Sequence, residues 1–227
     1  MSGDLDDLHP LEPEEHRSQL AAVLEHAADH DRAVDLGTGL GRIARPLAAN
    51  GACSVLAVDL DPRVLADPVW ADAHGVERLE EDFLAEDATW HRRGPFGVAS
   101  CLGNTLALLT GHDQLARLFD RAAEALRPGG RLLVDDFPVW GWAAVQAGEW
   151  PSGLSEDGEA QIVWHPGEPL FAFRSGTAVR AEEPLPLPGE RLLRLWSLSE
   201  LMHFASASGL EGPFHRSDHH LLTFRRP

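Results

Sequence analysis

Short apolar segments alternate with amphipathic stretches along the first 137 residues. Within residues 14–30, Leu20, Val23, Leu24 and Ala27 recur at helical spacing and predict a helix. Five short apolar runs follow and predict buried strands: RAVDLG (32–37), SVLAVDLD (54–61), VERLEEDF (76–83), FGVASCLG (96–103) and GRLLVDDF (130–137). Since strands alternate with helical or loop material, the pattern predicts a parallel sheet with helices on both faces.

A second amphipathic helix is predicted between the last two of these strands. The stretch HDQLARLFDRAAEALRPGG (112–130) places one apolar face on Leu115, Leu118, Phe119, Ala122 and Leu126. Pro128, Gly129 and Gly130 are expected to end this helix, because proline and glycine interrupt helical backbone.

The hydrophobic rhythm changes after Phe137. Residues 138–196 carry alternating runs, EAQIVWH (159–165), LFAFRSGTAVRA (170–181) and RLLRLWS (191–197), separated by turn-rich stretches. This pattern predicts an antiparallel meander inserted over one end of the sheet. The chain then returns to a helix in SLSELMHFASASGL (197–210), with Ser197 and Glu200 as a capping box and Gly209 as its stop.

A final strand pair near GPFHR (212–216) and HLLTFRR (220–226) completes the predicted sheet. The expected fold is therefore α/β: a Rossmann-like, doubly wound, mostly parallel seven-stranded sheet with an antiparallel β insertion after the fifth strand. Residues 1–137 and 197–227 form the expected core, and residues 138–196 form the expected inserted cap.

Composition narrows the classes of partner. The 227 residues are 44% hydrophobic, which is enough for one sizeable core, and the net charge of −17 would repel a polyanion, so no nucleic-acid partner is expected. The acidic start MSGDLDDLHPLEPEEH and the absence of a long apolar run predict a cytoplasmic protein without a membrane partner. Cys53 and Cys101 are far apart in sequence and suggest neither a disulfide framework nor a thiolate metal site.

The stretch AVDLGTGLGRIARPL (33–47) contains three glycines in five residues and favours a nucleotide-type ligand. Gly39, Gly41 and Ala44 satisfy the dinucleotide pattern G-x-G-x-x-A, with Asp59 placed to hold a ribose hydroxyl. Asp35 argues against a dinucleotide, because its carboxylate would lie near a pyrophosphate. A positively charged ligand without phosphate removes this conflict.

Five segments in order resemble the class I S-adenosylmethionine-dependent methyltransferases. They are VDLGTGLG (34–41), VLAVDLD (55–61), EEDF (80–83), CLGNTLALL (101–109) and LRPGGRLLVDDF (126–137). The segment CLGNTLALL is also similar to glycine N-methyltransferase-like enzymes and to small bacterial natural-product methyltransferases. The resemblance implies S-adenosyl-L-methionine as the cofactor and a small molecule as the methyl acceptor.

The resemblance also implies roles for individual residues. Asp35 would hold the methionine ammonium, directly or through water, and Asp59 would accept hydrogen bonds from the ribose hydroxyls. Asp82 would accept from the adenine amino group beside Phe83, and Arg17 would grip the methionine carboxylate. The remaining implied cofactor contacts lie in the glycine loop and after the second and fourth strands: Gly37, Thr38, Gly39, Gly41, Leu60, Leu102, Gly103 and Asn104.

The acceptor side of the site has weaker sequence signals. A phenol or alcohol acceptor gains from a general base, for which Asp136 and His112 are the catalytic candidates; an amine needs only to arrive unprotonated. Trp140, Trp142, Trp150 and Trp164 could line an acceptor pocket, and His203 is a further candidate substrate contact.

The twelve histidines give no metal signal. His26 and His30 are spaced i, i+4, and HRSDHH (215–220) supplies three more, but neither set has a carboxylate-rich frame, so no metal is predicted.

The predicted function is methyl transfer from S-adenosylmethionine to the nitrogen or oxygen of a small molecule. Two alternatives stay open: a cofactor-binding partner subunit without transfer activity, and an NAD-dependent oxidoreductase. The oligomeric state also stays open, with a homodimer as one arrangement.

Overall fold

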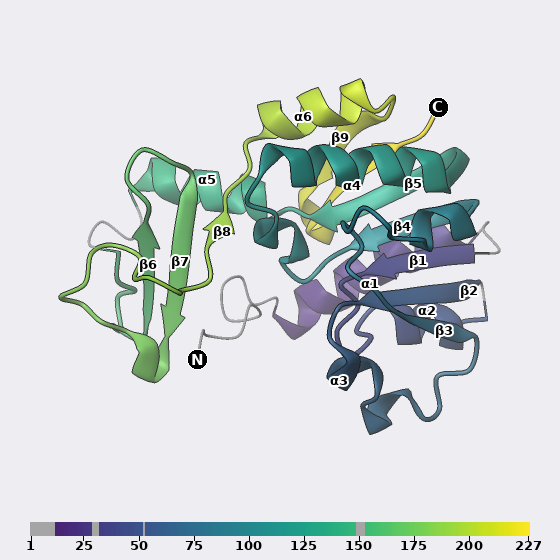
Figure 1. The fold of residues 1–227 in the computed structure, drawn as a ribbon, viewed down its shortest axis with the longest axis horizontal. Coiled ribbons are helices and arrows are strands. Elements are labelled where there is room, and N and C mark those ends of the chain that lie inside the picture. The colour runs from purple at the N-terminus through teal and green to yellow at the C-terminus, as the bar shows by residue number, and fades with distance from the viewer. Residues whose placement is uncertain (1–11, 29–31, 52, 149–152) are drawn as a thin grey trace.

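A seven-stranded sheet carries the larger part of the molecule, and a separate three-stranded sheet lies beside it (Figure 1). The computed structural model describes residues 12–28, 32–51, 53–148 and 153–227. The order of strands in the large sheet is β3-β2-β1-β4-β5-β10-β9. Its strands are β1 (Arg32–Leu36), β2 (Ser54–Asp59), β3 (Val76–Glu80), β4 (Phe96–Cys101), β5 (Leu126–Asp135), β9 (Glu211–Arg216) and β10 (Leu221–Arg225).

The first five strands are parallel, and β10 and β9 add an antiparallel pair at one edge. Strand order reverses around β1, which lies between β2 and β4, with Asp35 beside Ala57 on one side and Ser100 on the other. The carboxyl ends of β1 and β4 therefore diverge at the point where open α/β sheets bind ligands. This arrangement confirms the predicted fold class.

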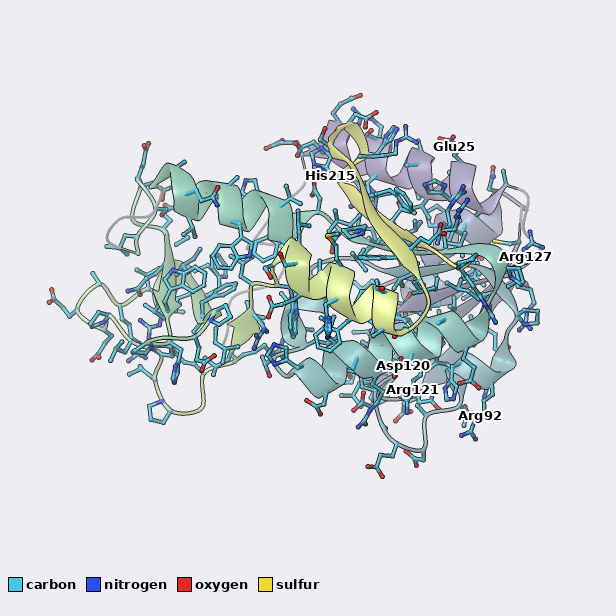
Figure 2. All side chains as sticks on the ribbon, turned by 90° about the horizontal axis from the view of Figure 1, so that it is seen from above. Glu25, Arg92, Asp120, Arg121, Arg127 and His215 are labelled. Atoms are coloured by element: carbon cyan, nitrogen blue, oxygen red, sulfur yellow. The ribbon has the colours of Figure 1, made fainter. Side chains whose placement is uncertain are left out.

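Helices cover both faces of the large sheet. They are α1 (Pro13–Ala27), α2 (Ala44–Ala49), α3 (Pro62–Leu65), α4 (His112–Ala125) and α6 (Leu198–Ala207), with α5 (Phe137–Ala147) next to the small sheet. Alternate strand residues face opposite layers: Val34 packs into the core that contains α4 and α6, and Ala33 packs into the core that contains α1 and α2. In Figure 2, α1 lies on one side of the large sheet and α4 on the other.

Helix α4 ends earlier than the sequence predicts. It stops at Ala125, and β5 begins at Leu126, so the Pro128–Gly130 stretch lies inside the strand instead of ending the helix. The backbone of this stretch finds sheet-like partners at the C-terminus: the Gly129 N–H donates to the Arg226 carbonyl at 2.8 Å, and the Arg226 N–H donates to the Gly130 carbonyl at 2.9 Å.

The region after Phe137 corrects the predicted meander, because it begins with a helix. Asp136 is the N-cap residue of α5, a proline follows in the first turn, and Gly148 ends the helix in a left-handed conformation at φ 75°. Gly141 allows close packing, since a Cβ atom there would lie 2.7 Å from Leu195 Cδ1. The antiparallel sheet itself follows as β6 (Ala160–Trp164), β7 (Leu170–Ser175) and β8 (Leu193–Arg194).

The small sheet is attached to the large one through a third apolar cluster. Phe137, Phe171 and Leu195 pack there with Ala107, which lies in the 3₁₀ turn Thr105–Leu108 after β4. Beyond it, Ser197 and Glu200 form the predicted capping box of α6. Within the described residues, no helix has both the length and the apolar character that crossing a bilayer requires.

Candidate functional site

A cavity of about 710 Å³ lies at the carboxyl ends of β1 to β4. Most of the sequence-predicted cofactor residues line it: Gly37, Thr38, Gly39, Asp59, Leu60, Asp82, Phe83, Leu102 and Gly103. Sequence analysis missed its other lining residues, which are Leu40, Arg42, Val64, Leu84, Thr105, Leu108, Leu109, Gln114 and Arg191. Four predicted cofactor residues lie outside the lining: Arg17, Asp35, Gly41 and Asn104.

The glycine loop adopts backbone conformations that side chains disfavour. Gly37, Gly39 and Gly41 have φ values of 67°, 52° and 78°. The Gly37 N–H donates to the carbonyl of Val58 on the neighbouring strand at 2.9 Å, which holds the start of the loop against β2. Gly41 is buried behind the loop, where a Cβ atom would lie 2.4 Å from the ring of Trp70. Its role is therefore packing beneath the cavity.

Asp59 lies at the end of β2 and links two loops of the cavity wall. Its Oδ2 accepts the Gly39 N–H at 2.8 Å, and its Oδ1 accepts the Asp61 N–H at 2.9 Å. Each carboxylate oxygen has two lone pairs, so these contacts leave acceptor capacity for ribose hydroxyls.

Asp35 lies beneath the glycine loop and is only 3% exposed. Its two oxygens accept hydrogen bonds from Ser100 Oγ at 2.6 Å and from Thr38 Oγ1 at 2.7 Å. Burial raises the pKa of Asp35, against the opposing effects of these hydrogen bonds and of the Arg42 charge. In this arrangement the carboxylate fixes Thr38 in the cavity wall and lies behind the wall itself.

Asp82 and Phe83 follow β3 and both face the cavity. Asp82 Oδ1 accepts the Leu84 N–H at 2.8 Å, which shapes the turn. The Phe83 carbonyl accepts from Trp90 Nε1 at 2.9 Å and from Arg121 Nη1 at 2.7 Å, which fixes the backbone beside the ring.

The turn after β4 rests on a second buried carboxylate, Asp135, which sequence analysis did not select. Asn104 has a left-handed backbone at φ 60°, and its N–H donates to Asp135 Oδ2 at 2.7 Å. Burial raises the pKa of Asp135, opposed by the Arg42 charge and the Asn104 hydrogen bond. This contact holds the turn so that Leu102 and Gly103 reach the cavity while Asn104 stays behind it.

Arg42 lines the cavity, whereas Arg17, the arginine that sequence analysis selected, does not. Arg17 is exposed and paired with Glu14 on the surface of α1. Arg42 lines the cavity directly after the third glycine, and its Nη1 donates to Gln19 Oε1 at 2.8 Å. It also contacts His16 Nδ1 at 3.0 Å. The pKa of His16 is lowered by burial and by the charges of Arg42 and Arg17, which favours a neutral imidazole beside the Arg42 guanidinium.

The two candidate proton acceptors lie outside the described cavity lining. Asp136 is buried at the start of α5, with its Oδ2 3.3 Å from Nε2 of His215 on the β9–β10 hairpin (Figure 2). His112 begins α4, and its Nε2 lies 3.2 Å from Glu200 Oε1 and 3.1 Å from Arg194 Nη2. His112 is thus part of the junction between β8 and α6.

The tryptophans pack the inserted segment against itself and the core. Trp140 and Trp164 line a small apolar cavity of about 30 Å³ between α5 and the small sheet. Trp142 Nε1 donates to the Trp196 carbonyl at 3.0 Å. His203 is exposed on α6, where its ring meets that of Phe204, and it lines none of these cavities. Trp150 lies outside the described residues.

No group of three or more His, Cys, Asp or Glu side chains suited to a metal ion occurs in the part of the chain that the structure describes. His30, one of the histidines weighed for metal binding, lies outside that part.

A buried strand, a loop of glycines with positive φ and a carboxylate at the end of the neighbouring strand are typical of Rossmann-like proteins that bind an adenosine-type cofactor. Residues 33–130 match the family model of a methyltransferase domain. This match over residues 33–130 and the geometry of the cavity support a class I S-adenosylmethionine-dependent methyltransferase, an enzyme with S-adenosylmethionine as its cofactor.

The chain has no match among curated protein sequences, but its fold is similar to solved methyltransferase structures. An amino pentose methyltransferase from Micromonospora echinaspora, solved with S-adenosylmethionine bound, has a TM-score of 0.64 at 16% identity, covering 93% of this chain and 92% of that chain. A sugar N-methyltransferase from Streptoalloteichus has a TM-score of 0.61 at 17% identity, covering 100% of this chain and 94% of that chain. The 1,6-didemethyltoxoflavin-N1-methyltransferase of Burkholderia thailandensis has a TM-score of 0.56 at 18% identity, covering 98% of this chain and 83% of that chain.

Proposed function

We propose that this enzyme transfers the methyl group of S-adenosylmethionine to a nitrogen or oxygen atom of a small molecule. The observation that carries the proposal is the cavity at the ends of β1 to β4, which also reaches Arg191, just before β8 of the small sheet. A cofactor in this cavity would therefore lie next to the inserted segment, which is the expected place for an acceptor.

The residues of the cavity fit the chemical groups of this cofactor. Asp59 is placed for the ribose hydroxyls, and Asp82 with Phe83 for the adenine amino group and ring. The Gly37 to Gly39 backbone allows close approach of the methionyl part. Arg42 offers a cation for the methionine carboxylate, the role that the sequence suggested for Arg17.

When bound, the cofactor supplies an electrophilic methyl group on a sulfonium, and the positive charge is lost as the methyl is transferred. The chain's own contribution is to exclude water and to align the acceptor with that methyl group. Asp136 is our candidate for taking the proton of a hydroxyl acceptor. We assign His112 to holding β8 against α6, because Glu200 and Arg194 already engage its ring.

The relatives support a small acceptor. By their names, the structural neighbours from Micromonospora and Streptoalloteichus methylate sugars, and the Burkholderia enzyme is an N1-methyltransferase of 1,6-didemethyltoxoflavin. We also propose a cytoplasmic location, supported by Cys53 and Cys101, which are both free thiols.

Titration calorimetry with S-adenosylhomocysteine, S-adenosylmethionine and NAD tests the proposal. We expect binding of the first two and none of NAD, because the buried carboxylate of Asp35 below the loop disfavours a pyrophosphate. Micromolar NAD binding without a response to S-adenosylhomocysteine would overturn it. A mass-spectrometric screen for methylated products, with amines and hydroxyl compounds offered separately, then identifies the acceptor atom.

A further inference from the structure

A second cavity, of about 820 Å³, lies within the inserted segment and carries three arginines. We propose that it binds the anionic group, a carboxylate or a phosphate ester, of the methyl acceptor through Arg180 and Arg191. This inference rests on the proposed function, because it assigns a chemical class to the acceptor of that reaction.

A buried arginine fixes the loop that borders the cavity. Arg174 on β7 is only 2% exposed, and its Nε and Nη2 donate to the two oxygens of Glu190 at 2.7 and 2.9 Å. Its Nη1 donates to Gln161 Oε1 at 3.0 Å and to the Glu183 carbonyl at 2.9 Å, and its Nη2 also donates to the Leu185 carbonyl at 3.0 Å. Arg174 therefore fixes the loop between β7 and β8 against the small sheet and has no role left for a ligand.

Buried Gln161 fixes the backbone of Arg180 in the same way. Its Oε1 accepts the Arg180 N–H at 3.0 Å, and its Nε2 donates to the Arg180 carbonyl at 3.0 Å. Arg191 follows Glu190, whose carboxylate is held by Arg174 and accepts the Leu187 N–H at 2.7 Å. The backbones that carry Arg180 and Arg191 are thus preorganised by a polar network beneath them.

The two guanidinium groups themselves are available. Among the described residues, no hydrogen bond or ion pair involves the Arg180 or Arg191 side chain, although the Arg180 charge helps to lower the pKa of Glu190. Three guanidinium groups and one carboxylate, that of Glu190, line the cavity, so its wall carries an excess of positive charge. Glu182 and Glu183 lie on the same loop but do not line it. On a chain of net charge −17, this local excess favours an anionic ligand.

Arg191 also connects this cavity to the reaction site, because it lines the cofactor cavity as well. An acceptor bound by its anionic group at Arg180 and Arg191 can extend its nucleophilic atom toward the methyl group. The arrangement would fix the distance between the anionic group of the acceptor and its methylated atom, and so restrict which acceptors react.

The test uses the full chain saturated with S-adenosylhomocysteine, so that added anions cannot bind in the cofactor cavity. Calorimetry at low ionic strength measures binding of inorganic pyrophosphate and of citrate, as phosphate and carboxylate probes. We expect at least one to bind with a dissociation constant of about 1 mM or tighter. Arg180→Gln and Arg191→Gln should each weaken it by about fivefold or more. The preferred probe indicates which anion the acceptor carries.

Arg92→Gln is the matched control, because this exposed arginine lies at the end of the core remote from the small sheet (Figure 2). The inference is overturned if neither probe binds, or if Arg180→Gln and Arg191→Gln have no larger effect than Arg92→Gln. Circular dichroism confirms folding of each variant. Binding of S-adenosylhomocysteine to the native chain, measured first, tests the methyltransferase function separately from the anion-binding cavity. If the native chain does not bind S-adenosylhomocysteine, the proposed function is refuted, whether or not the anions bind.

Discussion

Asp59 and Gly39 are joined in the wall of the cofactor cavity by a 2.8 Å hydrogen bond from the Gly39 N–H to the Asp59 carboxylate. The same carboxylate is our candidate for the ribose hydroxyls. Asp59→Ala should therefore remove both a ligand contact and a support of the glycine loop. We expect S-adenosylhomocysteine binding to weaken by about 1.5–3 kcal/mol, measured by calorimetry. Asp120→Ala, on the exposed face of α4, is the control and should bind normally; equal affinity of both variants would place the ribose elsewhere.

The glycine loop offers a matched pair of substitutions. Gly41→Ala would bring a Cβ atom to 2.4 Å from buried Trp70, whose Nε1 is fixed by the Val64 carbonyl at 2.8 Å, whereas a Cβ atom at Gly39 meets nothing within 4 Å. We expect Gly41→Ala to lower the free energy of unfolding by about 2–4 kcal/mol, and Gly39→Ala by about 1–2 kcal/mol. Urea denaturation measures both. Equal losses would mean that Trp70 moves aside.

Substitutions of Arg42 and of Arg17 are expected to have different effects on cofactor binding. Arg42→Gln should weaken S-adenosylhomocysteine binding by about tenfold, because a charged contact to the methionine carboxylate is lost. Binding of 5′-methylthioadenosine, which lacks that carboxylate, should be unchanged. Arg17→Gln should change neither affinity. If Arg42→Gln weakens both ligands equally, its effect is on the shape of the cavity and not on the carboxylate.

Glu200 makes the stability of the junction between β8 and α6 depend on pH. Burial raises the pKa of Glu200, but hydrogen bonds from Ser197, Arg194 and His112 outweigh it and bring the pKa to about 2, from an ordinary value of 4.5. The ionised carboxylate therefore stabilises the fold above pH 4.5, and this contribution is lost as the pH falls from 4.5 toward 2.

Glu200→Gln keeps the shape of the side chain and removes its charge. We expect a loss of about 1–2 kcal/mol of unfolding free energy at pH 7, limited by the partial exposure of the carboxylate to solvent. The difference from the native chain should shrink below pH 4.5. Glu211→Gln, which removes an exposed partner of Arg225, is the control with little effect. A difference that does not change with pH would show that the Glu200 charge is unimportant.

The tryptophans of α5 test whether the inserted segment belongs to the acceptor side. Trp142→Phe loses the hydrogen bond to the Trp196 carbonyl and should cost about 1 kcal/mol of stability. Trp140→Ala enlarges the small apolar cavity and should cost about 3 kcal/mol or more. Neither should alter S-adenosylhomocysteine affinity, since neither residue lines the cofactor cavity. A tenfold loss of that affinity in a folded variant would contradict the cap assignment.

Sequence pattern predicted the large sheet well because its strands are short apolar runs with clear ends. It failed at α5, where PVWGWAAVQ mixes tryptophan, valine and glycine, residues of modest or low helix propensity, without a polar face. Packing against Leu195 and the small sheet stabilises α5 as a helix, and such tertiary contacts cannot be recognised from the local sequence pattern. It also failed at Pro128 to Gly130, because the backbone hydrogen-bond partner of this stretch, Arg226, is almost a hundred residues away in sequence.

The lining of the cavity was predictable where residues stand at or just after the end of a strand, as Asp59 and Asp82 do. Arg191 was not, because only the folding of the β7–β8 loop brings it to the cavity. The sequence could have pointed to Arg42 as a cavity residue, because it directly follows the third glycine of the loop. Asp35 shows a further limit: spacing puts it at the end of the first strand, but only the structure shows its oxygens occupied by Ser100 and Thr38.

The hydrogen bond between Trp142 and the Trp196 carbonyl joins the two ends of the inserted segment to each other. The segment leaves the large sheet after β5 and returns at α6, so it forms one continuous stretch with adjacent ends. We therefore expect that the whole inserted segment can be replaced as one unit. We also predict that transplanting the corresponding stretch of another methyltransferase between Asp136 and Ser197 changes the choice of acceptor, while the strand ends proposed to hold the cofactor keep their sequence.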